Sequence, residues 1–234
     1  MYQTLEIKTL IKVIGGLGIL IFLVLWWYAP PGDSLWGWIK HISAAAGFTA
    51  TILAVFGSKW VFPHFWKLPL VQAMTFPYVA GEWTGTISSN WPVKKAMMDA
   101  FVKGHTAQGN EKLDIAALGT ESKRIKVTIE ADLFNVVMKL ETLDKYSVSY
   151  SLYVQPQRGG ALRCPRLAYI YQNDTHVPVN TDAESHFGAA FLEVSQDGKT
   201  LEGTYWTARN WTKGLNTAGR IVLRRNDEPE FPAQ

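Results

Sequence analysis

Two long apolar runs near the start of the chain restrict most strongly what this sequence can fold into. In the first, residues 10–29, the only charge is Lys12. A helix of these 20 residues is about 30 Å long at about 1.5 Å per residue, which matches the hydrocarbon thickness of a bilayer. The second run, about residues 39–58, follows a turn at residues 30–33. The pattern predicts two transmembrane helices within residues 1–62.

Two other structures are compatible with part of this pattern. A secretory signal also has a basic start and an apolar centre, but that centre is usually about 7–15 residues long and precedes a cleavage site, which is missing here. A buried helical hairpin of a soluble domain is the second alternative. Tryptophans near the ends of both runs favour transmembrane helices, because membrane proteins concentrate aromatic residues at the interface. They are Trp26, Trp27, Trp36, Trp38, Trp60 and Trp66.

The basic residues are unevenly distributed. Two lysines precede or open the first run and two follow the second, whereas the connecting turn holds Asp33 and Lys40. The positive-inside rule therefore predicts that both termini are cytoplasmic, and the single cysteine, Cys164, agrees with a reducing compartment. The net charge of +3 belongs to residues 1–80, which leaves 18 basic and 18 acidic residues in the remainder. Such a neutral remainder excludes a DNA- or RNA-coating surface.

The remaining sequence predicts one β domain. Pro63, Pro69 and Pro77 indicate that helix ends by about Val61, so residues 63–76 are expected to be a proline-rich linker. Apolar residues then alternate with period two, and Asp197-Gly198 is typical of a hairpin turn. We expect about eight antiparallel strands in an up-and-down β-barrel over residues 77–226, with a tail at 227–234. A two-sheet sandwich is the alternative.

Two features stand out within this β domain. Residues 93–103 lack the alternation and are expected to form a short helix that plugs one end of the barrel. Trp83, in the first strand, is interpreted as a plug in the barrel floor beneath an arginine such as Arg220 or Arg225.

Several short motifs occur in a fixed order along the strands. The first strand contains Gly81-x-Trp83-x-Gly85-x-x-Ser88-Ser89. The later motifs are Leu167-x-Tyr169-x-Tyr171, His186-x-Gly188-x-Ala190, Leu201-x-Gly203-x-Tyr205-x-Thr207-x-Arg209 and Gly219-x-Ile221-x-Leu223-x-Arg225. With the two apolar runs, the chain resembles the two-transmembrane β-barrel effectors of bacterial cyclic-oligonucleotide antiphage defence (CBASS).

This resemblance implies a function in the bacterial inner membrane. In that family a partner nucleotidyltransferase (CD-NTase cyclase) makes a cyclic dinucleotide during infection, and the barrel binds it. The effector then forms a homo-oligomer and disrupts the lipid bilayer, which kills the infected cell (abortive infection). The resemblance does not assign individual contacts to the ligand.

The contacts are therefore predicted from chemistry. Aromatic rings stack on bases, arginine pairs with phosphate, and small polar side chains bind base edges. Residues of these types are expected to face inward near one mouth of the barrel: Tyr150, Tyr169, Tyr171, Tyr205, Thr207, Arg209, Ser89 and Asn90.

The sequence contains no catalytic or metal-binding pattern. There is no Gly-x-x-x-x-Gly-Lys loop, His-Glu-x-x-His or Gly-x-Ser-x-Gly, and the histidines lack metal-ligand spacing. We expect a binding protein without metal or cofactor, not an enzyme. Two other classes stay open: a membrane-tethered, lipocalin-like carrier of a lipid or hydrophobic metabolite, and a structural membrane protein with a solidly packed barrel.

A row of small residues follows one face of the second apolar run. Ala46, Ala50 and Ala54 are four residues apart, a spacing that lets helices approach closely in a membrane. This row is expected either to associate with a second copy of the chain or to pack on Gly15 and Gly18 of the first run.

Overall fold

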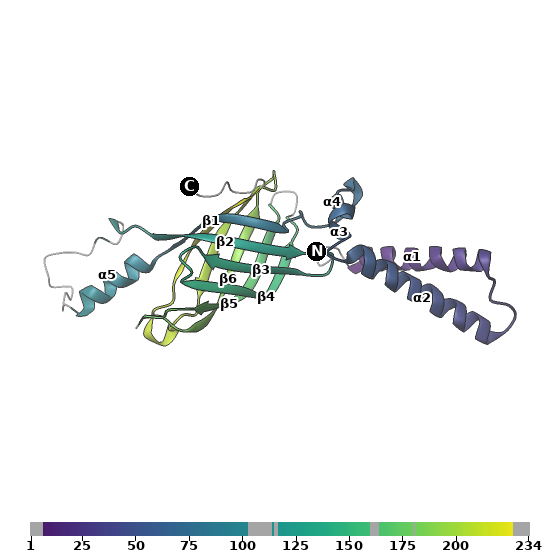
Figure 1. Cartoon of the computed structure of the whole chain (residues 1–234), viewed down its shortest axis with the longest axis horizontal. Helices are drawn as coiled ribbons and strands as arrows, with labels where there is room; N and C mark the ends of the chain where they lie inside the picture. Colours follow the sequence, from purple (N-terminus) through teal and green to yellow (C-terminus); the bar gives the residue numbers. More distant parts are fainter. Residues whose placement is uncertain (1–6, 103–113, 115–116, 160–163, 180, 227–234) are drawn as a thin grey trace. The chain divides into compact units, whose positions relative to one another are not determined.

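The chain divides into two compact units (Figure 1). One takes in Met1–Tyr78 and Ala131–Asn135 and is mainly helical; the other takes in Val79–Glu130 and Val136–Gln234 and is built around a β-barrel. The computed structural model describes residues 7–102, 114, 117–159, 164–179 and 181–226.

The helical unit begins with two long helices, α1 (Ile7–Tyr28) and α2 (Leu35–Gly57). Both are long and apolar enough to cross a membrane, judged by length and composition. The Ser34 hydroxyl caps α2 by accepting a 3.0 Å hydrogen bond from the backbone N–H of Gly37. The predicted pair of apolar N-terminal helices is confirmed.

The contact between α1 and α2 includes three buried side chains of α2. His41, Ala45 and Thr49 are buried. The rings of Phe22 and His41 pack edge to face with centroids 5.0 Å apart. Thr49 Oγ1 lies 3.6 Å from where a β-carbon on Gly18 would be, so this glycine lets the two helices approach.

The small-residue row of α2 lies on another face. Ala46, Ala50 and Ala54 are exposed. A β-carbon placed on Gly15 would have no neighbouring atom within 4 Å. The expected packing of the row on Gly15 therefore does not occur among the described residues of one chain, although Gly18 does face α2.

The segment predicted as a linker is partly helical. It contains α3 (Phe62–Trp66) and α4 (Pro69–Met74), each with a proline in its first turn. Proline is well tolerated there, because the first backbone N–H groups of a helix have no intrahelical acceptor. The prolines therefore start short helices instead of excluding them. Trp66 Nε1 donates a 3.0 Å hydrogen bond to the carbonyl of Phe76, which folds this segment back on itself.

The second unit is a closed antiparallel barrel (Figure 1). Each strand lies beside its sequence neighbour, and β1 pairs with β8. This confirms the predicted up-and-down barrel and excludes the sandwich. The strands are β1 (Gly81–Ser89), β2 (Glu121–Ala131), β3 (Val136–Thr142), β4 (Ser147–Gln157), β5 (Arg166–Thr175), β6 (Ser185–Val194), β7 (Thr200–Thr207) and β8 (Ala218–Arg225).

Two glycines allow β1 and β8 to close the barrel. A β-carbon on Gly85 would lie 1.9 Å from the carbonyl oxygen of Val222, and one on Gly219 would lie 1.7 Å from that of Ser88. Both distances are far inside van der Waals contact with rigid backbone. These two motif glycines are therefore required by the close approach of the strands.

The barrel floor is built around Trp83. Its side chain is fully buried and Nε1 donates a 2.9 Å hydrogen bond to the carbonyl of Val79. The Arg225 guanidinium lies 5.0 Å from the ring centroid. The interpretation of Trp83 as a floor plug beneath an arginine is confirmed for Arg225, whereas Arg220 pairs with Glu202 at the surface.

The predicted short helix is present as α5 (Trp91–Val102), but its expected role is wrong. Met97, Met98 and Phe101 are exposed, Phe101 by 85%, so these side chains do not plug the barrel. Only the start of the helix meets the cavity, through Trp91. Residue 103, the last of the predicted helix, lies outside the described residues.

Replacing Trp83 by alanine should strongly destabilise the barrel. The substitution removes a fully buried ring and leaves a cavity, which costs about 3–5 kcal/mol in the free energy of unfolding. The measurement is chemical denaturation of the full chain in detergent, followed by fluorescence or circular dichroism.

The matched control is Trp211→Ala, because this tryptophan is 71% exposed. Its free energy of unfolding should change by about 0.5 kcal/mol or less. Equal effects of the two substitutions would show that the barrel does not depend on Trp83.

Candidate functional site

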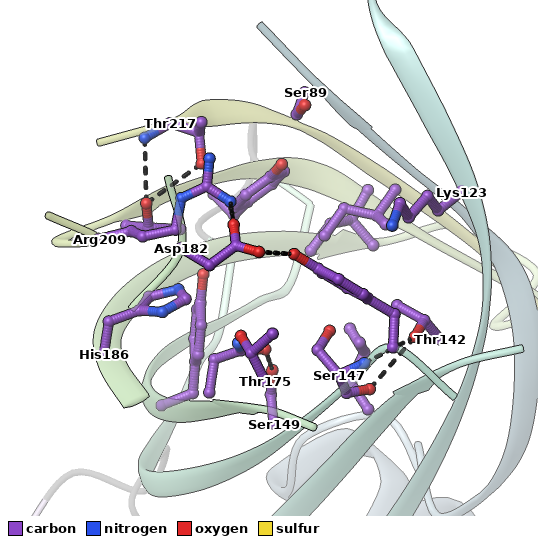
Figure 2. Close-up of a pocket in the computed structure, with 18 of the residues that line it drawn as sticks. Ser89, Lys123, Thr142, Ser147, Ser149, Thr175, Asp182, His186, Arg209 and Thr217 are labelled. Atoms are coloured by element: carbon purple, nitrogen blue, oxygen red, sulfur yellow. Dashed lines mark hydrogen bonds and ion pairs between the residues drawn. The ribbon is translucent and has the colours of Figure 1, made fainter. Parts of the chain in front are cut away.

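A cavity of about 230 Å³ opens at the end of the barrel opposite Trp83. It lies where β1 ends and β2 begins, and where the other strand pairs turn on the same side, because an up-and-down barrel brings alternate strand ends to one mouth. Figure 2 shows labelled side chains from several strands pointing into this space.

One wall of the cavity is made of small polar side chains (Figure 2). Ser147, Ser149 and Ser151 of β4 line the cavity, next to Asn173 and Thr175 of β5. Ser149 Oγ donates a 2.8 Å hydrogen bond to Asn173 Oδ1. This wall offers hydroxyl and amide groups to a ligand.

The expected inward orientation of Tyr150 is wrong. Its side chain is 45% exposed on the outer surface, because serines and not tyrosines occupy the inward positions at the start of β4. A β-bulge between Ser151 and Tyr153 then shifts the register, so that Val154 is buried after it. The alternating apolar residues of β4 therefore do not all lie on the same side of the strand.

Three buried tyrosines also line the cavity. Tyr169 and Tyr171 lie on β5 with ring centroids 5.7 Å apart, and Tyr205 lies on β7. Burial raises the pKa of all three phenols, that of Tyr205 to about 12. They are therefore neutral at physiological pH and offer flat apolar faces with hydroxyl groups.

Arg209 is one of the cations that line the cavity. Nη1 donates to Asp182 Oδ1 at 3.1 Å, and the guanidinium lies 4.9 Å from the ring centroid of Trp91. The arginine side chain is only 15% exposed. Its Nε is buried and has no hydrogen-bond partner among the described residues.

The other predicted residues divide into those that line the cavity and one that does not. Thr207 lines it, and its Oγ1 accepts a 3.0 Å hydrogen bond from the backbone N–H of Thr217. Ser89 lines it at the end of β1. Asn90 does not: its Oδ1 accepts a 3.0 Å hydrogen bond from the backbone N–H of Ala218, so this side chain holds strand ends together.

Further residues outside the predicted set also line the cavity, among them Asp182, Tyr146 and three others. Asp182 lies between β5 and β6 and its side chain is 3% exposed. It accepts hydrogen bonds from Tyr146 Oη and, at 3.0 Å, from the backbone N–H of Val179. The remaining three are Lys123, Trp91 and His186. No sequence pattern marks Asp182, because it lies in a connection between strands, outside the alternation.

His186 is uncharged in this environment. Burial, followed by the positive charge of Arg209, lowers the pKa of His186 to about 4 from its ordinary value of 6.5. Its Nδ1 is buried without a hydrogen-bond partner among the described residues. A neutral imidazole with one unused ring nitrogen suits hydrogen bonding to a ligand.

The fold and the cavity define a ligand-binding β-barrel preceded by two apolar helices. Residues 102–225 match the family model of the Cap15 cyclic dinucleotide receptor domain. The match covers more than half of the chain, and the chain belongs to this family. It is also 29% identical over 179 residues to CD-NTase-associated protein 15 of Escherichia albertii, which covers 76% of each chain. The resemblance inferred from the sequence motifs is confirmed.

The lowered pKa of His186 predicts how stability changes with pH. Between about pH 6.5 and pH 4 the unfolded chain binds a proton that the folded chain does not, so the free energy of unfolding falls as the pH is lowered through this window. Replacing His186 by glutamine should reduce this fall, measured as melting temperature against pH.

His176→Gln is the control, because His176 is exposed near the same mouth. This variant should keep the pH dependence of the wild-type chain. If His186→Gln also keeps it, the pKa of His186 is not lowered in the folded protein.

Proposed function

We propose that the barrel binds a cyclic dinucleotide and that the chain is a membrane-anchored effector of cyclic-oligonucleotide antiphage signalling. The observation that carries the proposal is Arg209, whose side chain lines the cavity and is only 15% exposed. A buried donor of this kind suits an anionic group such as a phosphate. Membership of the cyclic dinucleotide receptor family supports the same ligand.

The rest of the cavity suits the bases and the second phosphate. Tyr169, Tyr171 and Tyr205 provide ring surfaces, and the serine wall provides hydroxyl groups for base edges. Lys123, whose Nζ lies 3.9 Å from the ring centroid of Tyr146, is a second cation at the cavity. Of the predicted contacts, we retain Ser89, Tyr169, Tyr171, Tyr205, Thr207 and Arg209.

This lining fits a nucleotide better than a lipid. A lipocalin-like carrier requires an apolar cavity without inward arginines, whereas Arg209, Lys123 and Asp182 all line this one. We propose that the chain acts by binding and not by catalysis, since the family is defined by a receptor domain. The relative from Escherichia albertii is named for its association with a CD-NTase, which supports such a cyclase as the source of the ligand here.

The two helices and their lysines support an inner-membrane location. We propose that α1 and α2 span the bilayer with both termini in the cytoplasm. Lysines lie at the start of α1 and after the end of α2, and positive residues favour the cytoplasmic side. This topology exposes the barrel to a ligand made in the cytosol.

Substituting Arg209 tests the binding proposal. Removing a charge-assisted contact costs about 1.5–3 kcal/mol, so Arg209→Ala should weaken binding of a cyclic dinucleotide about ten- to hundredfold. The measurement is calorimetry on the full chain in detergent with a panel of cyclic dinucleotides. Melting curves accompany it, because the variant leaves the buried Asp182 carboxylate without its cation.

Arg220→Ala is the control. Arg220 pairs with Glu202 on the outer surface, and both side chains are about half exposed or more. This variant should bind like the wild type. Unchanged affinity in Arg209→Ala would remove Arg209 from the binding site, and a panel in which nothing binds the wild-type chain would contradict the proposed ligand class.

We further propose that ligand binding leads to a homo-oligomer whose helices disrupt the bilayer. The exposed row of Ala46, Ala50 and Ala54 supports this step, since no described residue of the chain packs on Gly15. Small residues four apart favour close helix association in lipid. Contacts between barrels would raise the effective concentration of the helices.

Enlarging this row should separate binding from membrane damage. Ala50→Leu combined with Ala54→Leu should abolish ligand-triggered dye leakage from liposomes while leaving the affinity for the cyclic dinucleotide unchanged. Ala44→Leu, which makes the same kind of change once on another exposed face of α2, should leak like the wild type. Full leakage from the double variant would show that the row takes no part in association.

A further inference from the structure

The buried ion pair in the cavity has an unusual position for a purely structural contact. Asp182 and Arg209 both line the cavity, and their side chains are 3% and 15% exposed (Figure 2). The acid therefore neutralises the same arginine that suits an anionic ligand. A phosphate that approaches Arg209 meets a cation already paired with a carboxylate.

The groups around Asp182 are also the donors that a phosphate would use. Its carboxylate accepts from Arg209 Nη1, from Tyr146 Oη and from the backbone N–H of Val179. Phosphate and carboxylate oxygens accept hydrogen bonds from the same kinds of donor. A ligand phosphate and the Asp182 carboxylate therefore compete for at least two side chains, Arg209 and Tyr146.

The position of Asp182 in the chain allows this competition without disturbing the barrel. The residue lies between β5 (Arg166–Thr175) and β6 (Ser185–Val194), outside both strands. The first backbone hydrogen bond of this hairpin, from Thr175 N–H to the Glu184 carbonyl at 2.8 Å, does not involve it. The Asp182 side chain can leave Arg209 while the strand pairing stays intact.

We infer that Asp182 is an internal competitor of the ligand: its carboxylate occupies the anion position on Arg209 in the empty receptor and lowers the affinity for a phosphate-bearing ligand. This inference rests on the proposed function of the same cavity. In a cavity with reduced solvent, a fixed negative charge beside the phosphate position opposes binding. Only a ligand that supplies enough further contacts displaces it, so Asp182 sets the concentration at which the receptor responds.

Neutralising the acid without changing its shape tests the inference. Asp182→Asn retains an oxygen that accepts from Tyr146 and Val179 but removes the charge. We expect it to bind a cyclic dinucleotide about tenfold more tightly, which corresponds to about 1.4 kcal/mol. Calorimetry on the full chain in detergent would use cyclic di-AMP, cyclic di-GMP and cyclic GMP-AMP. Inorganic pyrophosphate is an added probe, because it has phosphates but no bases.

Two further variants assign the effect. Asp174→Asn makes the same change in net charge on the same hairpin, but Asp174 does not line the cavity, so its affinity should equal that of the wild type. Combining Asp182→Asn with Arg209→Ala should abolish the gain, because the competition acts through Arg209. Melting curves check that each variant is folded, and Asp182→Ser replaces Asp182→Asn if the latter is not.

The outcomes separate this inference from the proposed function. If a cyclic dinucleotide binds the wild type and Asp182→Asn binds it equally or more weakly, Asp182 positions Arg209 and the inference is wrong while the proposed function stands. If no cyclic dinucleotide binds but pyrophosphate binds Asp182→Asn more tightly than the wild type, the competition stands and the ligand class is wrong. If neither probe binds any variant, both are wrong.

Discussion

Closure of the barrel by the pairing of β1 with β8 is the constraint on which the rest of this structure depends. It removes the open strand edges that a sheet would otherwise expose. It also places the ends of distant strands around one mouth, so that Ser89 of β1 and Thr217 before β8 reach the same cavity. The close approach requires Gly85 and Gly219, whose β-carbons would collide with backbone carbonyls of the opposite strand. A ligand site at this mouth exists only because the chain closes.

The cavity combines features that oppose one another electrostatically. Arg209 and Lys123 are cations, whereas Asp182 and Glu121 are acids, and all four line the same space. A receptor for an anionic signal could in principle use cations alone. Pairing Arg209 with a buried acid keeps the empty cavity free of an uncompensated buried charge, which would destabilise the fold. On the inference that Asp182 competes with the ligand, stability of the empty barrel and affinity for the ligand make opposite demands on this residue.

In the helical pair, one face of α2 packs on α1 and another face of α2 is exposed. His41, Ala45 and Thr49 face α1, and Phe22 packs on the His41 ring. The row of Ala46, Ala50 and Ala54 lies on a different face of α2 and is exposed. One helix thus presents two faces with different compositions: one satisfied inside the chain, and one formed by small residues that suit contact with another helix.

The sequence by itself determined the architecture, because hydropathy and alternation are local properties. Long apolar runs specified the helices, period-two alternation specified the strands, and Trp83 was recognised as a floor residue from its place in the first strand. The cavity was only partly predictable. Tyr169, Tyr171 and Tyr205 follow the alternation and face inward. In β4 serines take the inward positions, so Tyr150 lies outside, and a later bulge between Ser151 and Tyr153 shifts the register. The tertiary structure alone decided the pairing of Asp182 with Arg209 and Tyr146, since these residues are separated in sequence and meet only when the strands close around one mouth.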